Sequence, residues 1–387
     1  MSAVVAPRAP ALALDPILVG AVVALTALGA VMVGSASISL ADRETGEPLY
    51  FFLRHLGALA IGGVGLLITV ALPSELWYRL NWLLLVAGVG LLTIVFLPSL
   101  GHTVNGSTRW LAFGPVTLQA SEPARLCLLL YLASYAVRHA QELGGSLKGF
   151  LKPMLIVAAA AVLLLLEPDF GAVVVLTATS LGVLFIGGAR LRDFLLAVTV
   201  GSVVLGALAF SSAYRVERLT TFLDPWADPY ASGFQLTQSL IAIGRGEWLG
   251  VGIGESVQKL FYLPEAHTDF VFAVLAEELG FVGASLVIAL FALIVYRAVM
   301  LGQQAIQNGM PFQGLVATGI GLMLGLSAFI NIGVNAGLLP TKGLTLPLVS
   351  YGRSSAVVTL AAVGLLLRIH HELHGTPKRL LQRGHVR

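Results

Sequence analysis

The sequence predicts an all-α polytopic membrane protein, with about ten transmembrane helices in a single integral-membrane domain at 1–387. Of its 387 residues 57% are hydrophobic and only 11% are charged, and the mean hydropathy is +0.88. A soluble domain carries about 25% charged residues. The apolar runs are about 20 residues long and do not alternate with period two, which predicts helices rather than barrel strands as the membrane-spanning elements.

Apolar runs predict ten spans, at about 15–38, 52–72, 80–98, 121–138, 153–167, 170–187, 193–211, 269–297, 312–334 and 348–370. The first run is longer than the apolar core of a typical cleaved signal peptide, so we expect it to be retained, although Ser35-Ala36-Ser37 resembles a cleavage site. The longest polar segment, 212–268, falls between spans seven and eight and is predicted to be a large extracytoplasmic loop.

The lysines and arginines of the short loops lie mostly on one side of the predicted membrane, together with the basic tail at 371–387. The positive-inside rule places that side, and therefore both termini, in the cytoplasm. The net charge of +3 is small and scattered, so it gives no argument for a nucleic-acid partner. Cys127 is the single cysteine, which excludes an intrachain disulfide and a cysteine metal cluster.

The stretch 258–283 joins the large loop to the eighth span, and Asp269 stands at the junction. Ionisable residues are costly where lipid begins, so one placed there indicates a functional site. Helix capping by Thr268 or Asp269 is the alternative that residue types alone favour, and a cap contributes roughly 1 kcal/mol. A cap leaves four nearby polar residues without a role: Glu265, His267, Glu277 and Glu278.

The helix predicted to begin near Asp269 is longer than the hydrocarbon layer is thick, so only part of it can lie within the membrane. Leu279–Tyr296 is an uncharged run of 18 residues, just enough to span about 30 Å of hydrocarbon. We therefore expect 269–278 to stand above the lipid or to line a wet cavity, with Asp269 facing water.

Other outer segments also carry polar residues. Arg109, which precedes a tryptophan, suits an interfacial anchor. Glu122 and Arg125 are three residues apart and are expected to face each other on one helix, as a structural pair or in a substrate site. In the turn Glu167-Pro168-Asp169, Asp169 is predicted to cap the next helix. A GxGxG pattern lacks the flanking strand and helix of a dinucleotide site and predicts a tight loop, at Gly250, Gly252 and Gly254.

Two prolines and two glycines interrupt the chain before the tenth span, at 337–347. Non-helical backbone at membrane depth is tolerated only where protein or water covers it, so we expect this segment to fold back into a cavity, with a plain outer loop as the alternative. It would bring to the outer side Lys342, Ser350, Tyr351, Arg353, Ser354 and Ser355.

Such a cavity would place cations beside carboxylates at the outer interface. Arginine clamps phosphates bidentately and lysine binds them as a point charge, so this mixture suits an anionic lipid head group. The cations are Arg109, Arg125, Lys342 and Arg353, and the carboxylates are Glu122, Glu265 and Asp269.

These outer motifs resemble those of the SEDS family (shape, elongation, division and sporulation), through most of the chain. The specific stretches are PEAHTDF at 264–270 and the PxxSYGxSS ending at 347–355. Pro340-Thr341-Lys342-Gly343 is more similar to the division branch than to the elongation branch. The other matches are Gly106–Trp110, Gln119–Glu122, Pro168–Gly171, Glu277–Gly280 and Leu339–Ser355. The chain departs from the family pattern at Arg353 (usually glycine), Arg125 (usually lysine) and Ala120 (usually proline).

The resemblance implies a peptidoglycan glycosyltransferase that polymerises lipid II on the outer face of the bacterial inner membrane, at the division site. It implies that Asp269 is the essential acidic residue and that a divalent cation, Mg²⁺ or Mn²⁺, takes part, with Asp269 and Glu265 as candidate ligands. Implied partners are a class B penicillin-binding protein (the division transpeptidase), regulatory divisome proteins and membrane lipid. Predicted substrate-binding residues are Arg109, Glu122, Arg125, Lys259, Glu265, His267, Lys342, Ser350, Tyr351, Ser354 and Ser355.

The implied reaction fits the residue types. The donor sugar leaves a lipid pyrophosphate, and the acceptor hydroxyl needs a base as it attacks the anomeric carbon, which a single displacement inverts. An aspartate, with an ordinary pKa of about 3.9, is ionised at neutral pH and can accept that proton. A metal-ligand role for Asp269 stays open, because Mg²⁺ favours carboxylates together with substrate phosphates.

Two other functions remain as alternatives. A lipid II flippase would also need many spans and a polar cavity, but it should expose polar groups in both halves of the membrane, whereas the ionisable residues here cluster in the outer half. A non-catalytic scaffold would leave Asp269 and the surrounding cations without a purpose.

Overall fold

The computed structural model describes residues 12–104, 107–113, 116–210, 216, 220–341 and 343–375. Within these ranges the helices are α1 (Pro16–Thr45), α2 (Tyr50–Ala71), α3 (Ser74–Arg79), α4 (Asn81–Ile94), α5 (Ser121–Arg138), α6 (Ala140–Gly145), α7 (Leu147–Leu166), α8 (Phe170–Ile186), α9 (Leu191–Phe210), α11 (Phe234–Gly246), α12 (Val271–Gln307), α13 (Pro311–Asn335) and α14 (Arg353–His374).

The helical membrane architecture is confirmed. Each of the ten predicted runs coincides with one helix, namely α1, α2, α4, α5, α7, α8, α9, α12, α13 and α14. In the described ranges six helices are long and apolar enough to cross a membrane: α1, α2, α7, α12, α13 and α14. The exact count of ten spans stays a prediction.

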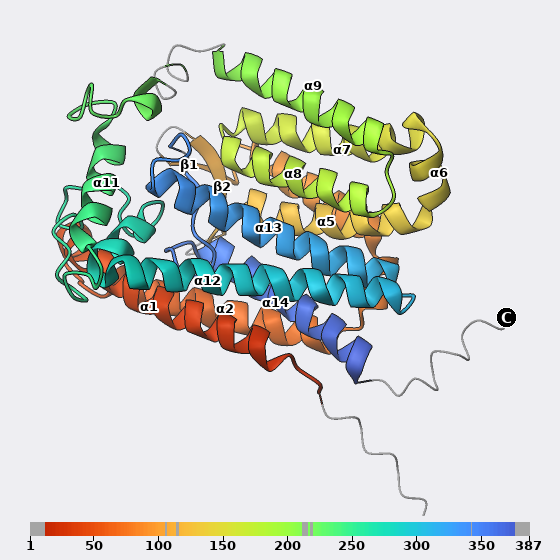
Figure 1. Cartoon of the computed structure of the whole chain (residues 1–387), viewed down its shortest axis with the longest axis horizontal. Helices are drawn as coiled ribbons and strands as arrows, with labels where there is room; N and C mark the ends of the chain where they lie inside the picture. Colours follow the sequence, from red (N-terminus) through yellow and green to blue (C-terminus); the bar gives the residue numbers. More distant parts are fainter. Residues whose placement is uncertain are drawn as a thin grey trace, which may run out of the picture.

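The long helices lie side by side along one direction, and α9 lies at the edge of the bundle (Figure 1). The most extensive pairs are α2 with α14 and α12 with α13. Glycine allows α2 and α14 to approach closely: a Cβ on Gly62 would lie 2.7 Å from a Leu360 methyl, and one on Gly364 would lie 2.0 Å from the Thr69 hydroxyl. Small residues at such contacts are typical of helix packing in membranes.

Both ends of the described chain meet at one end of the bundle. Asp15 caps α1 through its side chain and also accepts a hydrogen bond from Arg297 Nε of α12 at 2.8 Å. The N–H of Ala13 donates to His371 Nδ1 near the end of α14 at 3.1 Å. The β-strands and α11 lie at the opposite end (Figure 1).

A small antiparallel sheet follows α4 and departs from the all-α prediction. Its strands are β1 (Gly101–Val104), β2 (Ser107–Phe113) and β3 (Val116–Gln119), in the order β1-β2-β3. Trp110 pairs with His102 on one side and with Gln119 on the other. The overlooked signal is local: Asn105-Gly106 between β-forming residues is a hairpin signature.

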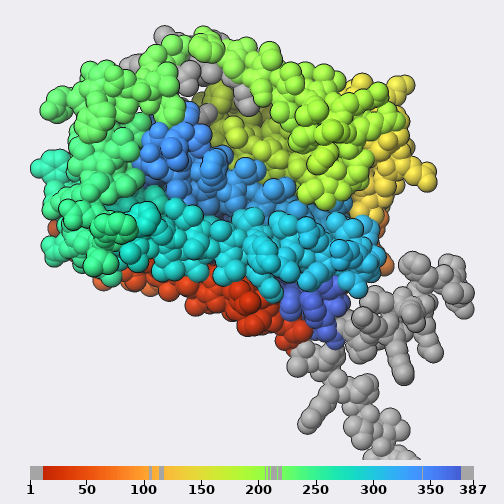
Figure 2. Space-filling model, in the orientation of Figure 1, coloured from red at the N-terminus to blue at the C-terminus, as the bar shows by residue number. Residues whose placement is uncertain are grey.

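The helix α12 is broken near its N-terminal end. Gly280 has φ 67° and ψ −167°, which only glycine adopts easily, so 271–279 and 281–307 are two helical segments. Residues 271–278 are buried within the protein, so this short segment neither stands free above lipid nor is widely open to water. The uncharged run predicted to span begins at the break. Figure 2 shows α11 and the neighbouring loop covering this end of α12.

Candidate active site

The N-terminus of α12 is capped by another helix. The sequence named Thr268 or Asp269 as the cap, whereas the N-cap position is held by Phe270, which makes no side-chain cap bond. Asn335, at the end of α13, supplies the cap instead: its Oδ1 accepts a hydrogen bond from the N–H of Ala273 at 3.1 Å. This amide also donates to the nearby Phe270 carbonyl at 3.1 Å, and the second acceptor comes from 62 residues away, which no local pattern can reveal.

Two asparagines of α13 hold the main chain of Asp269. Nδ2 of Asn335 donates to the Asp269 carbonyl at 3.0 Å, and Nδ2 of Asn331 donates to the same oxygen at 2.9 Å. The Asn331 amide also donates to the carbonyl of Leu344 at 2.6 Å. Asp269 is thereby fixed beside the segment 343–352, and a Cβ on Gly343 would lie 3.1 Å from Asp269 Oδ2.

The segment 343–352 is non-helical and folds back against the bundle, as expected. Four of its hydrophobic side chains are buried in the core: Leu344, Leu346, Leu348 and Val349. A Cβ on Gly171, at the start of α8, would lie 2.5 Å from Leu344 Cγ, so this glycine is needed for the contact. The Pro168–Gly171 motif and the segment after α13, far apart in sequence, therefore meet beside Asp269.

The predicted pair of Glu122 and Arg125 forms at the start of α5. Arg125 Nη2 and Glu122 Oε1 make an ion pair, and their side chains are only 6% and 10% exposed. Two nitrogens of this guanidinium, Nε and Nη1, are buried without a hydrogen-bond partner in the described part of the protein. The pair lines a small cavity together with Thr345, Pro347 and Ser355. A buried cation with unused donors, whose side chain lines a cavity, is suited to an anionic ligand.

Arg109, on β2, reaches the turn between α7 and α8. Its Nε donates to the carbonyl of Glu167 at 2.9 Å, and Nη2 donates to the carbonyl of Pro168. The predicted cap by Asp169 is confirmed, because its Oδ1 accepts from the N–H of Ala172 at 3.1 Å. The other Asp169 oxygen accepts from Gln119 and Ser121. This network joins the sheet, α5 and α8.

His267 lies in an aromatic cluster. Its ring is 5.1 Å from that of Phe51 and 5.5 Å from that of Tyr351, and its carbonyl accepts from the Tyr351 N–H at 2.9 Å. Burial holds the pKa of His267 below its ordinary value, although the nearby Glu265 carboxylate acts in the opposite direction. The imidazole is therefore neutral at pH 7, and it packs as an aromatic ring rather than acting as a cation.

The serines predicted to bind substrate differ in their surroundings. Ser350 Oγ accepts from the N–H of Leu346 at 2.8 Å, and Ser354 Oγ accepts from the N–H of Gln119 at 2.8 Å. Ser355 lines the cavity. Arg353, at the unusual position, donates to Thr117 Oγ1 of β3 and so ties α14 to the sheet. Lys342 lies outside the described residues, and the substrate roles of all these side chains stay predictions.

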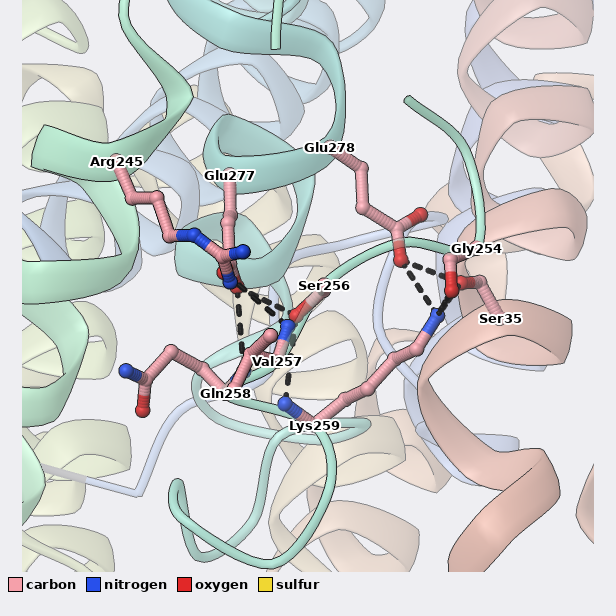
Figure 3. Close-up of polar contacts among 9 residues, drawn as sticks. All are labelled: Ser35, Arg245, Gly254, Ser256, Val257, Gln258, Lys259, Glu277 and Glu278. Carbon is pink, nitrogen blue, oxygen red and sulfur yellow. Dashed lines mark hydrogen bonds and ion pairs between the residues drawn. The ribbon is translucent and has the colours of Figure 1, made fainter. Parts of the chain in front are cut away.

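Lys259 binds to other residues of the protein through its ammonium group. Its ammonium donates to Glu278 Oε1 at 2.8 Å, to Ser35 Oγ at 2.8 Å and to the carbonyl of Gly254 at 2.6 Å (Figure 3). The three N–H donors of the ammonium group all have acceptors, which gives Lys259 a structural role in the loop. Its predicted role in substrate binding stays a prediction.

The predicted divalent cation would depend on two carboxylates, and its site stays a prediction. The described ranges hold no group of three or more His, Cys, Asp or Glu side chains able to enclose a metal ion. Asp269 is half-buried and Glu265 is exposed, four positions apart in the chain. Mg²⁺ in phosphate chemistry is commonly held by one or two carboxylates together with substrate phosphates and water, which these two residues can supply.

Comparisons with known proteins agree with the motifs. The family model FtsW/RodA/SpoVE, described as "Cell cycle protein", matches residues 16–375. A probable peptidoglycan glycosyltransferase FtsW from Nitrosococcus halophilus is 55% identical over 358 residues, covering 92% of each chain. One of the same description from Hahella chejuensis is 51% identical over 361 residues, covering 93% of this chain and 90% of that protein.

Solved structures give the same result. A chain from a study entitled "Structural coordination of polymerization and crosslinking by a peptidoglycan synthase complex" matches with a TM-score of 0.76 and 30% identity, over 94% of this chain and all of the other. The rod shape determining protein RodA of Thermus thermophilus matches with a TM-score of 0.70 and 30% identity, over 95% and 99%. The chain therefore belongs to the FtsW/RodA/SpoVE family of cell cycle proteins, whose members are the SEDS proteins.

Proposed function

We propose that this protein is the FtsW-type peptidoglycan glycosyltransferase of a bacterial cell, which polymerises lipid II on the outer face of the inner membrane during division. One observation carries the proposal: Asp269, the buried Glu122–Arg125 pair and the segment 343–352 come together at one end of the helical bundle, away from both chain ends. The names of the curated relatives support the reaction class.

Asp269 is proposed as the general base. Its main chain is fixed by two asparagines, so its carboxylate has a defined place beside Gly343. It would accept the proton of the acceptor hydroxyl as the glycosidic bond forms and the pyrophosphate leaves with inversion at the anomeric carbon. Positioned general bases contribute typically 10²–10⁴-fold.

The leaving pyrophosphate needs positive charge. Arg125, which lines the cavity, offers two buried guanidinium nitrogens that have no partner among the described residues, and Lys342 precedes Gly343 in the chain. A bound divalent cation would add further neutralisation of the phosphate charge; Glu265 would hold it, with Asp269 as a second ligand in the alternative in which Asp269 is not the base. A charge as buried as that of Arg125 is screened less by water and therefore acts more strongly.

The site is proposed to face the outside of the cell, with both termini in the cytoplasm, ten helices crossing the membrane, and 212–268 as an extracytoplasmic loop. The positive-inside rule and the common end of both chain termini support this orientation. We also propose a class B penicillin-binding protein and divisome regulators as partners at the division site. The match to a chain of a peptidoglycan synthase complex supports the first of these.

The direct test is polymerisation of purified lipid II by the purified protein in detergent, with and without the cognate transpeptidase. Glycan strands longer than two disaccharides, formed by the protein with its partner, are expected. Transport of lipid II across vesicles without any polymer would favour the flippase instead and contradict the proposal.

A further inference from the structure

The loop before Asp269 is joined to α12 at the point where that helix is broken. In a continuous helix the N–H groups of Phe281 and Val282 would donate to the carbonyls of Glu277 and Glu278. Here the N–H of Phe281 donates to the carbonyl of Glu247 at 2.8 Å, and the N–H of Val282 donates to the carbonyl of Trp248 at 3.2 Å. The carbonyls of Glu277 and Glu278 in turn accept from Val251 and Gly252, at 3.0 and 3.1 Å.

Four hydrogen bonds from the loop 247–252 thus occupy the groups that the break separates. Glycines make this approach possible: a Cβ on Gly250 would lie 2.1 Å from the Glu278 carbonyl oxygen, and one on Gly280 would lie 2.3 Å from the Gly250 nitrogen. The tight loop predicted from the GxGxG pattern is this insertion. Backbone groups at the membrane boundary are in this way satisfied without a continuous helix.

Two buried glutamates lock the same loop through their side chains (Figure 3). Glu277, 0% exposed, accepts from Arg245 of α11 at 2.8 Å, from the Ser256 hydroxyl and from two backbone N–H groups of the loop. Glu278, 1% exposed, accepts from Lys259 at 2.8 Å and from Ser35 of α1 at 2.6 Å. Removing one member of such a buried pair leaves an uncompensated charge and is strongly destabilising locally.

Asp269 depends on this lock because it precedes a short helical segment. The segment 271–279 is about 14 Å long and ends at the glycine break, so the remainder of α12 does not set its direction. Asn331 and Asn335 hold its start, while Glu277 and Glu278 hold its end. The direction of the segment, and with it the place of Asp269, follows from these two anchors.

We propose that Glu277 and Glu278 are positioning residues for Asp269, acting by locking the loop 247–259 into the break of α12. The expected effect on the reaction rests on the proposed catalytic role of Asp269. The expected effect on the position of Asp269 does not depend on that role. Arg245, Lys259 and Ser35 act with the glutamates as partners in this lock.

A cross-linking experiment measures the position directly. Cysteines replace Asp269 and Gly343 in a chain whose native thiol is removed by Cys127→Ser, since a Cβ at position 343 lies close to the Asp269 carboxylate. Disulfide formation requires Cβ atoms about 3.5–4.5 Å apart, so its rate reports whether the two positions stay adjacent. Glu277→Gln and Glu278→Gln are expected to slow cross-linking about tenfold, as a locally loosened site should. Glu255→Gln, in the same loop but exposed, should leave the rate unchanged.

A second pair of variants serves if either glutamine variant does not fold. Lys259→Arg keeps the charge that faces Glu278 and should retain the wild-type cross-linking rate, whereas Lys259→Met should lose it. Equal rates in both, or unchanged rates in the glutamine variants, would overturn the inference.

Activity separates this inference from the proposed function. With Asp269 intact, Glu277→Gln should lower kcat for glycan polymerisation about 10²-fold with little change in KM, because small displacements of a catalytic group cost that much. If cross-linking slows but Asp269→Asn still polymerises normally, the lock stands and the catalytic assignment fails. If cross-linking is unaffected while Asp269→Asn is inactive, the catalytic assignment stands and the lock fails.

Discussion

At the residue scale, the polar residues at the end of the bundle that holds Asp269 differ in how their hydrogen-bonding groups are used. Arg125 retains buried donors without partners in the described ranges, whereas Lys259 has none to spare. Asp269 is held through its carbonyl, while its carboxylate lies beside Gly343. Substitutions that change only one of these properties can therefore separate catalysis from folding.

Asp269→Asn tests the base with the smallest structural change. The carbonyl that Asn331 and Asn335 hold is retained, so stability should change by less than about 1 kcal/mol, within the range of a conservative change at a partly exposed site. An amide cannot accept the acceptor proton, so polymerisation should fall by roughly 10²-fold or more. Rates come from purified protein and lipid II, with thermal unfolding as the control. Near-normal polymerisation would remove Asp269 from the mechanism.

The stability of the protein should depend on pH through His267. Its pKa is below the ordinary 6.5 in the folded state, so the unfolded chain binds more protons as the pH falls below about 6.5. Stability must therefore decrease on acidification in that window. His267→Phe keeps the ring against Phe51 and Tyr351 and should show a shallower loss of Tm between pH 7.5 and 5. Identical slopes for the two proteins would contradict the assignment.

At the element scale, helix ends here are completed by distant elements. The amides of α12 are capped from α13, and the break in α12 is filled by a loop. The sequence signals for a cap were present at Thr268 and Asp269. The N-cap position falls instead at Phe270, one residue after Asp269 and two after Thr268, and Asn335 provides a side-chain acceptor there. Local propensity is a weak guide where another element is close enough to offer its side chain.

Asn335→Ala tests the cap from α13. Asn335 is fully buried, and its loss leaves the Ala273 N–H with only the Phe270 carbonyl as acceptor and takes one donor from the Asp269 carbonyl. Each of these hydrogen bonds contributes about 0.5–1.5 kcal/mol, so Tm should drop measurably. Asn308→Ala is the matched control, because that asparagine is exposed and bonds only one carbonyl in its own helix turn in the described structure. Equal Tm values for the two variants would refute the capping role.

At the scale of the whole molecule, the positions of the helices were predictable and the contacts of the site were not. Each of the ten predicted apolar runs coincides with a helix, because the length needed to cross a membrane is a physical constraint. The sheet was missed because its short strands carry no apolar run. The Glu122–Arg125 pair was predictable from helical spacing, whereas the asparagine contacts to Asp269 span more than 60 residues and need the tertiary fold.

The orientation of the molecule is testable by labelling. In a Cys127→Ser chain, a cysteine at Ser232, which is exposed near the end with α11, should react with a membrane-impermeant maleimide in intact cells. A cysteine at Gln382, in the basic tail, should react only after the membrane is permeabilised. The opposite pattern would place the proposed active site in the cytoplasm.

The close pairing of α2 with α14 also dictates the order in which the protein can be completed. Thr69 of α2 donates to the carbonyl of Ala361, 292 residues further along the chain, at 3.0 Å. At about 5–20 residues per second, the ribosome needs on the order of 15–60 s to make that stretch, and α2 spends this time without its main neighbour. A nascent chain that stops before Arg353 presents the groove at Gly62 to lipid or to the insertion machinery. The bundle closes only when the last helix enters the membrane.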